Sequence, residues 1–332
     1  MKAIVQDAYG PPEVLRLTEV EPTQAGDDDV LVRVVAAGVD AGVWHSVAGL
    51  PYLARAMGLG LRTPTSRFCG TDLAGVVEAV GANVTTVKVG GEVYGSCDPL
   101  AGGAFAELAR VQPGHLATKP ANLSFEQAAA CPVSGVTALQ ALRDAGALQP
   151  GQTVLVTGAG GGVGSFAVQI ARALGAAEVT GVCGGAKVEL VRSLGVDQVI
   201  NYADGDFTSG ARQYDLILDT AGRRPLTLVR RVLTPQGTLV IVGGEGGGRW
   251  LGGFDRQMVR APALSLVSDQ RFRPVMAKVT SADLQALRVL IEAGKVTPVV
   301  DRVLPLAHAA EAVRYTHAGL AKGKVVLSVA EA

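Results

Sequence analysis

The sequence contains few of the residues that would place it in several common protein classes. Of its 332 residues only four are cysteine, and aromatic residues make up 5%. The cysteines are Cys69, Cys97, Cys131 and Cys183, and no two form a Cys-x-x-Cys pair. We therefore expect neither a disulfide framework nor a structural zinc site. No run approaches about 18 uninterrupted apolar residues, and the first residues lack the apolar core of a signal peptide, so neither a membrane segment nor export is expected.

The charge balance and the size of the chain further limit the partners and the domain organisation that we expect. Acidic and basic residues balance at 30 each and there is no polybasic run. Neither nucleic acid nor an anionic membrane is therefore an expected partner. A hydrophobic content of 48% permits a sizeable core, and the length suggests about two domains. We expect a folded cytoplasmic protein.

The most informative segment is residues 151–175. Residues 154–157 (VLVT) predict a buried strand, glycines dominate residues 158–164, and residues 166–174 have the apolar spacing of a helix. A glycine motif carries weight in this context, because glycines let backbone N–H groups approach a pyrophosphate at a helix N-terminus. The segment therefore predicts a dinucleotide cofactor.

The next strand and helix indicate which cofactor binds. Residues 178–183 (EVTGVC) predict a strand, and the acid that usually binds a free ribose 2′-OH is missing at its end, where two glycines stand. Lys187 lies just beyond, and Tyr202 follows a third short strand. An ammonium group in place of a carboxylate favours NADP(H) over NAD(H). The alternative is that Lys187 is an ordinary solvated helix residue.

Two patterns alternate along the chain. Short β-like runs separated by Gly, Pro and Asp predict a small irregular β-barrel, at residues 3–6, 15–19, 30–37, 75–80, 92–95 and 104–109. A helical pattern over residues 124–145 begins with a capping box at Ser124 and Gln127. Strands then alternate with helices, which predicts a doubly wound parallel sheet with strands near 153–157, 179–183, 198–201, 215–219, 237–242 and 263–267.

The C-terminal part returns to a mixed pattern. We predict helices and strands there at residues 281–293, 299–304, 307–316 and 324–329. The fold class is thus α/β with two domains. We assign residues 1–120, completed by 270–332, to a barrel-containing catalytic domain. Residues 121–269 form the inserted dinucleotide-binding domain with six parallel strands.

Several motifs carry a resemblance to a known family. They are AGGGVG at residues 159–164, GTDLAGVV at 70–77 and GAFAE at 103–107. With the order of the parts, they resemble the medium-chain dehydrogenase/reductase superfamily, in its zinc-free quinone oxidoreductase (zeta-crystallin-like) branch. This implies a GroES-like barrel and a Rossmann domain. The implied cofactor-binding residues are Thr137, Ala159, Gly160, Gly161, Gly162, Val163, Gly164, Lys187, Tyr202, Gly243 and Gly244.

The resemblance also implies chemistry without a metal. Zinc-dependent relatives have a cysteine and a histidine where this chain has Asp40 and Thr71. Catalytic zinc needs about three protein ligands, and the chain has four histidines in all. We predict no metal site. The alternative combination is His45 with Asp72 or Cys69.

Hydride addition to an already activated double bond makes the smallest demand on a protein without a metal. The protein must hold the nicotinamide near the acceptor carbon and offer hydrogen-bond donors to the carbonyl oxygen. We therefore predict an NADPH-dependent reductase of small-molecule enones or quinones. The alternatives are a zinc-free carbonyl reductase or alcohol dehydrogenase, and a non-catalytic NADPH-binding protein.

Candidates for the substrate wall are Asp40, Trp44 and Tyr52. Asp40 stands where an asparagine is common in the family. Trp44 is either a ring platform or a core residue, and Tyr52 either donates its hydroxyl to an enolate or packs in a loop. Asp40 and Tyr52 are the candidates for a catalytic role. Two basic loops, at residues 63–67 and 271–274, are candidates for the rim.

Two further expectations follow from the fold. Gly243 and Gly244 follow the fifth strand, so they should lie at the carboxyl edge of the sheet, where they either admit the nicotinamide ribose or form a plain turn. The strand at residues 263–267 would form an exposed sheet edge, which is a liability unless it is paired. Family members pair this edge across a twofold axis, and we predict a homodimer by that route.

Overall fold

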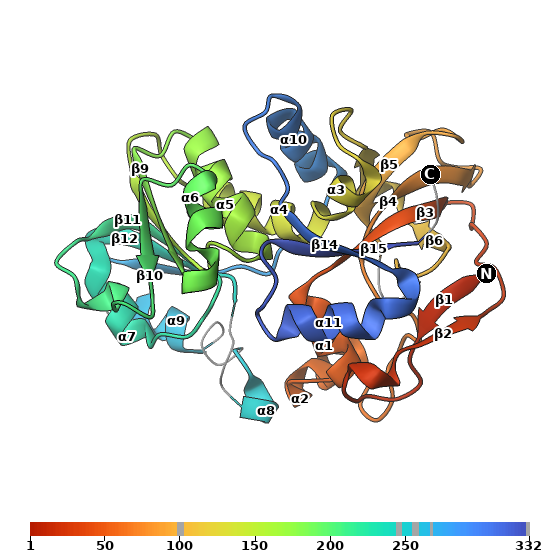
Figure 1. Cartoon of the computed structure of the whole chain (residues 1–332), viewed down its shortest axis with the longest axis horizontal. Coiled ribbons are helices and arrows are strands. Elements are labelled where there is room, and N and C mark those ends of the chain that lie inside the picture. The colour runs from red at the N-terminus through yellow and green to blue at the C-terminus, as the bar shows by residue number, and fades with distance from the viewer. Residues whose placement is uncertain (98–102, 244–247, 254–258, 266–267, 330–332) are drawn as a thin grey trace. The chain divides into compact units, whose positions relative to one another are not determined.

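The computed structural model describes residues 1–97, 103–243, 248–253, 259–265 and 268–329 (Figure 1). Two compact units divide the chain. The first contains Met1–Val136, Lys278–Ala293 and Pro298–Ala332, and the second contains Thr137–Ala277 and Gly294–Thr297. Residues 121–136 thus belong to the first unit and residues 270–277 to the second.

The first unit is built on an extensive, mainly antiparallel sheet. Its order is β14 (Val300–Pro305), β15 (Lys324–Ser328), β3 (Val30–Val39), β4 (Asp72–Val80), β5 (Glu92–Ser96) and β7 (Leu116–Thr118), with β6 (Leu108–Val111) paired to β3. The C-terminal strand β15 pairs antiparallel with β3, and β14 runs parallel to β15. A separate pair is formed by β1 (Lys2–Val5) and β2 (Arg16–Glu19).

Strand β3 is the centre of this unit. Its sequence, VLVRVVAAGV, is rich in β-branched residues, and every side chain except that of Arg33 is buried. It pairs with β4, β6 and β15, so its side chains form the middle of the core. The run predicted at residues 104–109 differs from the structure. The strand there is β6, which begins at Leu108, and Ala106 makes only an isolated bridge to Ala3.

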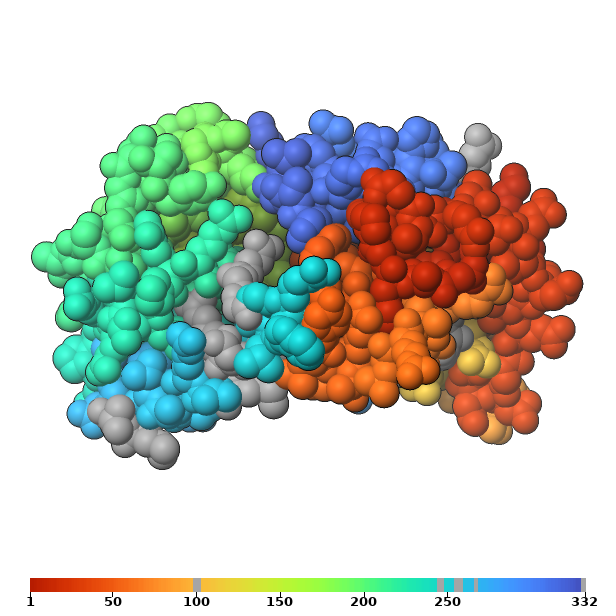
Figure 2. All heavy atoms as spheres, turned by 90° about the horizontal axis from the view of Figure 1, so that it is seen from below, coloured from red at the N-terminus to blue at the C-terminus, as the bar shows by residue number. Residues whose placement is uncertain are grey.

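Helices of the first unit flank this sheet. They are α1 (Ala41–Ala48), α2 (Tyr52–Ala54), α3 (Phe125–Ala129), α10 (Ser281–Glu292) and α11 (Ala309–His317). Helix α4 (Pro132–Gln140) begins in this unit and ends in the second. The predicted capping box at Ser124 and Gln127 is confirmed at the start of α3. Helix α11 lies beside α1, and Figure 2 shows its blue surface next to the red and orange N-terminal residues.

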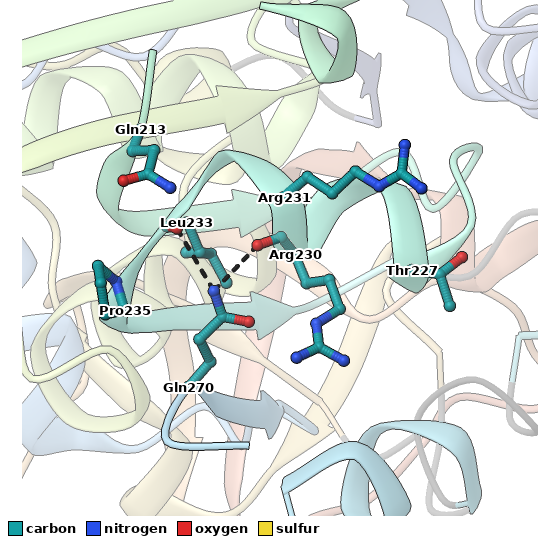
Figure 3. Close-up of a pocket in the computed structure, with 7 residues that line it drawn as sticks. All are labelled: Gln213, Thr227, Arg230, Arg231, Leu233, Pro235 and Gln270. Carbon is teal, nitrogen blue, oxygen red and sulfur yellow. Dashed lines mark hydrogen bonds between the residues drawn. The ribbon is translucent and has the colours of Figure 1, made fainter. Parts of the chain in front are cut away.

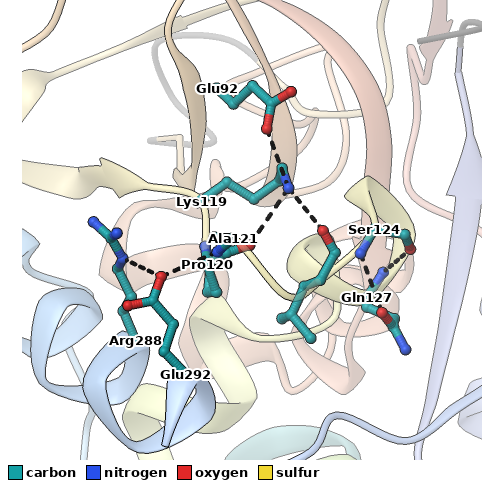
Figure 4. Close-up of polar contacts among 9 residues, drawn as sticks. Glu92, Lys119, Pro120, Ala121, Ser124, Gln127, Arg288 and Glu292 are labelled. Carbon is teal, nitrogen blue, oxygen red and sulfur yellow. Dashed lines mark hydrogen bonds and ion pairs between the residues drawn. The ribbon is translucent and has the colours of Figure 1, made fainter.

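A polar cluster joins α10 to the segment that follows β7 (Figure 4). The buried ammonium of Lys119 pairs with Glu92 at 3.1 Å and donates to the carbonyl oxygen of Leu123 at 2.7 Å. Glu292 on α10 accepts a hydrogen bond from the backbone N–H of Ala121 at 3.0 Å. Because Lys119 has partners on both sides, burying its charge is compensated and the segment is fixed.

The second unit is a six-stranded, wholly parallel sheet, as predicted. Its order is β10 (Gln198–Asn201), β9 (Glu178–Cys183), β8 (Thr153–Thr157), β11 (Tyr214–Asp219), β12 (Leu233–Ile241) and β13 (Arg271–Pro274). The helical elements named below are α5 (Gly162–Ala173), η5 (Gly185–Lys187), α6 (Val188–Ser193), α7 (Leu226–Val229), η7 (Arg230–Val232) and α9 (Ala261–Ser265). Five of the six strands lie where the sequence predicts them.

The sixth strand is not where we predicted it. Residues 261–265 form helix α9, and residues 266–267 lie outside the described residues. The edge strand is instead β13, which we had interpreted as a loop on the rim of the substrate pocket. A short apolar run such as ALSLV does not separate strand from helix by periodicity. In β13 only Phe272 is buried, and exposed arginines stand on either side of it. The segment therefore shows no apolar pattern from which a strand could be predicted.

Candidate active site

The glycine loop of the second unit joins β8 to α5 in a tight turn. Gly158 has φ +67°, a conformation that favours glycine. Gly161 precedes α5 and provides no side-chain cap for the first N–H groups of the helix. A Cβ added to Gly164 would lie 2.1 Å from the carbonyl oxygen of Gly158, so only glycine lets α5 pack this closely on β8. The helix N-terminus is thus available to an anion.

The end of strand β9 places a lysine beside this loop. The backbone N–H of Lys187 donates to Gly184 O at 2.9 Å, and the side chain of Lys187 lies against Gly160, where a Cβ would come within 2.8 Å of it. Burial raises the pKa of the Cys183 thiol, and the charges of Lys187 and Arg192 partly offset that rise. Both cations are therefore close to the end of β9.

Tyr202 also lies beside the end of strand β9. Its hydroxyl faces Gly184, where an added Cβ would lie 2.6 Å from the hydroxyl oxygen, and the residue is 55% exposed. A cavity of about 610 Å³ opens between α6 and β10, and Arg192 lines it together with Glu189 and Asp204. Arg192 forms an ion pair with Glu189 at 2.5 Å, and sequence reasoning did not single it out.

The loops that follow β8, β11 and β12 meet at the carboxyl edge of the sheet. Thr157 donates to Asp219 Oδ1 at 2.5 Å, and the hydroxyl of Thr220 donates to Thr157 O at 2.6 Å. A Cβ on Gly243 would lie 1.9 Å from Thr220 O, so this position requires glycine. Gly244 lies outside the described residues. Sequence reasoning also missed the Asp219–Thr220 turn, which directly follows a buried strand.

In the first unit, Asp40 and Asp72 belong to one polar cluster. Asp40 caps α1 by accepting from Gly42 N–H at 2.7 Å, and its other oxygen accepts from Thr71 Oγ1 at 3.2 Å. Asp72 is fully buried, accepts from Val133 N–H at 3.0 Å, and pairs with the buried ammonium of Lys324 at 3.3 Å.

The pKa of Asp72 depends on burial and on the charges of neighbouring residues. Burial raises the pKa of Asp72 to about 7, the charge of Lys324 opposes this rise, and the charge of Asp40 adds to it. Asp40 is thus held in place by two donors, and Asp72 is held by a cation and a backbone N–H group. No local pattern in the sequence indicated Lys324 as the partner of Asp72.

The two aromatic candidates have other contacts within the first unit. The indole of Trp44 stacks on the imidazole of His317, with ring centroids 3.7 Å apart and planes at 2°. One face of the indole is therefore covered, and Trp44 also packs against the core. The guanidinium of Arg55 lies 4.9 Å from the ring centre of Tyr52, which begins α2.

The remaining sequence candidates are distributed as follows. Thr137 is buried in α4, and it is the first residue of the second unit. Within the described ranges, no group of three or more His, Cys, Asp or Glu side chains is arranged to hold a metal ion. His45 instead bonds through Nδ1 to Leu50 O at 2.7 Å, and burial raises the pKa of the Cys69 thiol to about 12. Within those same ranges, no helix is both long and apolar enough to cross a membrane.

Comparison with known proteins identifies the family. Residues 26–121 match the alcohol dehydrogenase GroES-like domain, and residues 194–327 match the zinc-binding dehydrogenase family. The chain is 32% identical to a 2-methylene-furan-3-one reductase of Solanum lycopersicum, over 98% of this chain and 79% of that protein. It is also 32% identical to a chloroplastic NADPH-dependent alkenal/one oxidoreductase of Arabidopsis thaliana, with the same coverage.

A solved structure agrees with these relatives. The quinone oxidoreductase of Escherichia coli, solved in complex with NADPH, has a TM-score of 0.83 and 26% identity, covering 99% of this chain and all of that one. The chain belongs to the medium-chain dehydrogenase/reductase superfamily. Within it, its relatives are quinone oxidoreductase-like proteins, and the chain is an oxidoreductase. The predicted GroES-like and Rossmann domains are confirmed.

Proposed function

We propose that this protein is an NADPH-dependent reductase that transfers hydride to an activated C=C bond or a quinone without using zinc. One observation carries the proposal: the glycine loop at the start of α5 lies against Lys187, just beyond strand β9, whose carboxyl end carries no acid. That arrangement suits a dinucleotide with a phosphate on its 2′ oxygen. The names of the NADPH-dependent relatives support it.

The residues present fit the cofactor. The first N–H groups of α5, which have no partner within the helix, would bind the pyrophosphate, and Gly161 would permit its close approach. Lys187 and Tyr202 would hold the 2′-phosphate, and Arg192, which pairs with Glu189, would add positive charge nearby. Gly243 leaves room for the nicotinamide ribose beside the loop after β11. Bound NADPH supplies the hydride from C4 of its nicotinamide.

The protein's share in the chemistry is positioning and stabilisation of charge. Hydride addition to the β-carbon of an enone places negative charge on the carbonyl oxygen, which needs a hydrogen-bond donor. We assign that donor role to the hydroxyl of Tyr52. We place Asp40 in the substrate wall, where hydrogen bonds from Gly42 N–H and Thr71 Oγ1 hold its carboxylate. Zinc-dependent relatives have metal ligands where Asp40 and Thr71 bond to each other, which supports a mechanism without zinc.

Steady-state assays test the proposed function. NADPH oxidation is measured with 1,4-naphthoquinone, an acyclic enone and a simple ketone, and we expect turnover with the first two. Turnover with ketones alone identifies a carbonyl reductase or alcohol dehydrogenase instead. Tight NADPH binding with no turnover of any acceptor identifies a non-catalytic binding protein.

A homodimer is part of the proposal. Within the described residues, β12 is the strand that pairs with β13, and we propose that the other edge of β13 pairs with a second copy of the chain. Light scattering coupled to size-exclusion chromatography should give twice the 34.0 kDa chain mass, and the mass of one chain would contradict the dimer. A cytoplasmic location stays a prediction.

A further inference from the structure

A second hollow of the nucleotide-binding unit is lined by the residues labelled in Figure 3. It has a volume of about 510 Å³. Three lining residues stand at the amino ends of neighbouring parallel strands, because Gln213 precedes β11, Leu233 begins β12 and Gln270 precedes β13. Gly158 instead follows the carboxyl end of β8. The hollow is therefore separate from the proposed cofactor site.

The polar lining is suited to an anion. Arg230 and Arg231 contribute guanidinium groups, Thr227 a hydroxyl and Gln213 an amide, and no carboxylate lines the hollow. Within the described part of the chain neither arginine forms an ion pair, and Arg230 donates only to Ser268 Oγ, at 3.3 Å. Other arginines of this unit are paired, for example Arg172, Arg212 and Arg224 with Asp197, Glu178 and Asp206.

The surrounding sequence is strongly basic although the whole chain is neutral. Residues 221–275 contain nine arginines, no lysine and three acidic residues, a net charge of +6, whereas the full chain has 30 residues of each sign. Arg230 and Arg231 are the arginines of this segment that line the hollow. The excess is hidden in the overall charge balance of the chain, because the remaining residues carry the opposite net charge.

The arginine-bearing turn is held in a fixed position. The side-chain amide of Gln270 donates to Arg230 O at 2.9 Å and approaches Leu233 O at 3.4 Å, as Figure 3 shows. It also contacts Thr234 O at 3.3 Å. These bonds tie η7 to the start of β13, so the two guanidinium groups extend from a backbone that is already ordered. Such a frame reduces the entropy lost on binding.

We propose that this hollow binds a phosphorylated small molecule, independently of the cofactor. Arg230 binds the phosphate through its guanidinium group, which matches phosphate oxygens in a bidentate geometry. Arg231, whose side chain extends in another direction in Figure 3, adds a second positive charge. Thr227 and Gln213 add neutral hydrogen bonds. The volume is larger than one phosphate requires and Leu233 and Pro235 are apolar, so the ligand carries a compact organic body such as a sugar.

Calorimetric titration tests the proposal with two probes, inorganic phosphate and glycerol 3-phosphate. The full-length protein is saturated with NADP⁺ and kept at constant ionic strength. We expect saturable binding, with a Kd of about 1–10 mM for phosphate and tighter binding for the ester. Arg231→Gln, at an exposed position, and Arg230→Lys, which keeps the charge but loses the fork, should each weaken binding by about tenfold. Arg16→Gln, in the first unit, is the matched control and should change Kd by less than about twofold.

The outcomes are decisive in both directions. Thermal unfolding and NADPH oxidation should be unchanged in both hollow variants, since neither residue belongs to the proposed cofactor site. Absence of saturable binding, or equal affinity in wild type and both variants, overturns the proposal. Failure of NADP⁺ to bind counts against the proposed function alone, because the dependence of phosphate binding on Arg230 and Arg231 is then measured without it.

Discussion

At the scale of single residues, Lys187 gives the most specific prediction about which cofactor binds. Lys187→Glu places a carboxylate beside the 2′-phosphate, so we expect NADPH affinity to fall at least about tenfold while NADH affinity changes little. Fluorescence titration with both cofactors measures the preference. Lys295→Glu, an exposed change in the same unit, is the matched control. An unchanged preference in Lys187→Glu would remove Lys187 from the site.

Asp72 predicts a particular pH dependence of stability. Its pKa is about 7 in the folded protein and near 3.8 when unfolded, so between these values unfolding releases a proton. The contribution of Asp72 to stability is therefore largest at low pH and falls as pH rises towards 7. Asn cannot titrate, so the destabilisation by Asp72→Asn should be smaller at pH 8 than at pH 5, by at least about 1 kcal/mol.

Urea unfolding of both proteins at a series of pH values measures this difference. A penalty for Asp72→Asn that stays constant or grows with pH would show that the carboxyl has an ordinary pKa. Asp72 lies in a motif that could be recognised in the sequence. Its partner Lys324 could not be recognised, because the two residues are 252 positions apart and a lone lysine in a C-terminal strand has no local signature.

At the scale of elements, substitutions of two neighbouring glycines distinguish the packing of α5 from the binding of NADPH. A Cβ on Gly164 would collide with Gly158 O, so Gly164→Ala should cost about 1–3 kcal/mol of stability. A Cβ on Gly161 meets only that oxygen, at 3.3 Å, and at an N-cap position Gly161→Ala should cost less than about 1 kcal/mol. Both variants should lose NADPH affinity, since Gly161→Ala places a methyl group where the pyrophosphate approaches.

Urea unfolding and calorimetric NADPH titration of the two variants separate these effects. Wild-type NADPH affinity in Gly161→Ala would place the pyrophosphate elsewhere.

The loop could be predicted from sequence because strand, turn and helix are adjacent in the chain. Strand β13 could not be predicted, because three of its four side chains are exposed and its strand character comes from pairing with β12.

At the scale of the whole molecule, the decisive prediction concerns zinc. Asp40 and Thr71 stand where zinc-dependent relatives place ligands, and catalytic zinc needs about three ligands. We therefore expect the purified protein to contain far less than one zinc per chain, and to keep its NADPH-dependent turnover after dialysis against a chelator. Mass spectrometry of metal content with an activity assay tests both. Stoichiometric zinc whose removal abolishes turnover would overturn the proposed mechanism.

The sequence alone determined the parallel sheet and the place of the glycine loop, and the resemblance of its motifs to a known family indicated the class of protein. The sheet and the loop depend on periodicity, glycine placement and neighbouring elements, which are local properties of the chain. Only the tertiary structure decided that Lys324 pairs with Asp72, that His317 covers a face of Trp44, and that Arg230 and Arg231 share a hollow with Gln270. These contacts join residues far apart in sequence, and burial, charge pairing and strand order exist only once the chain has folded.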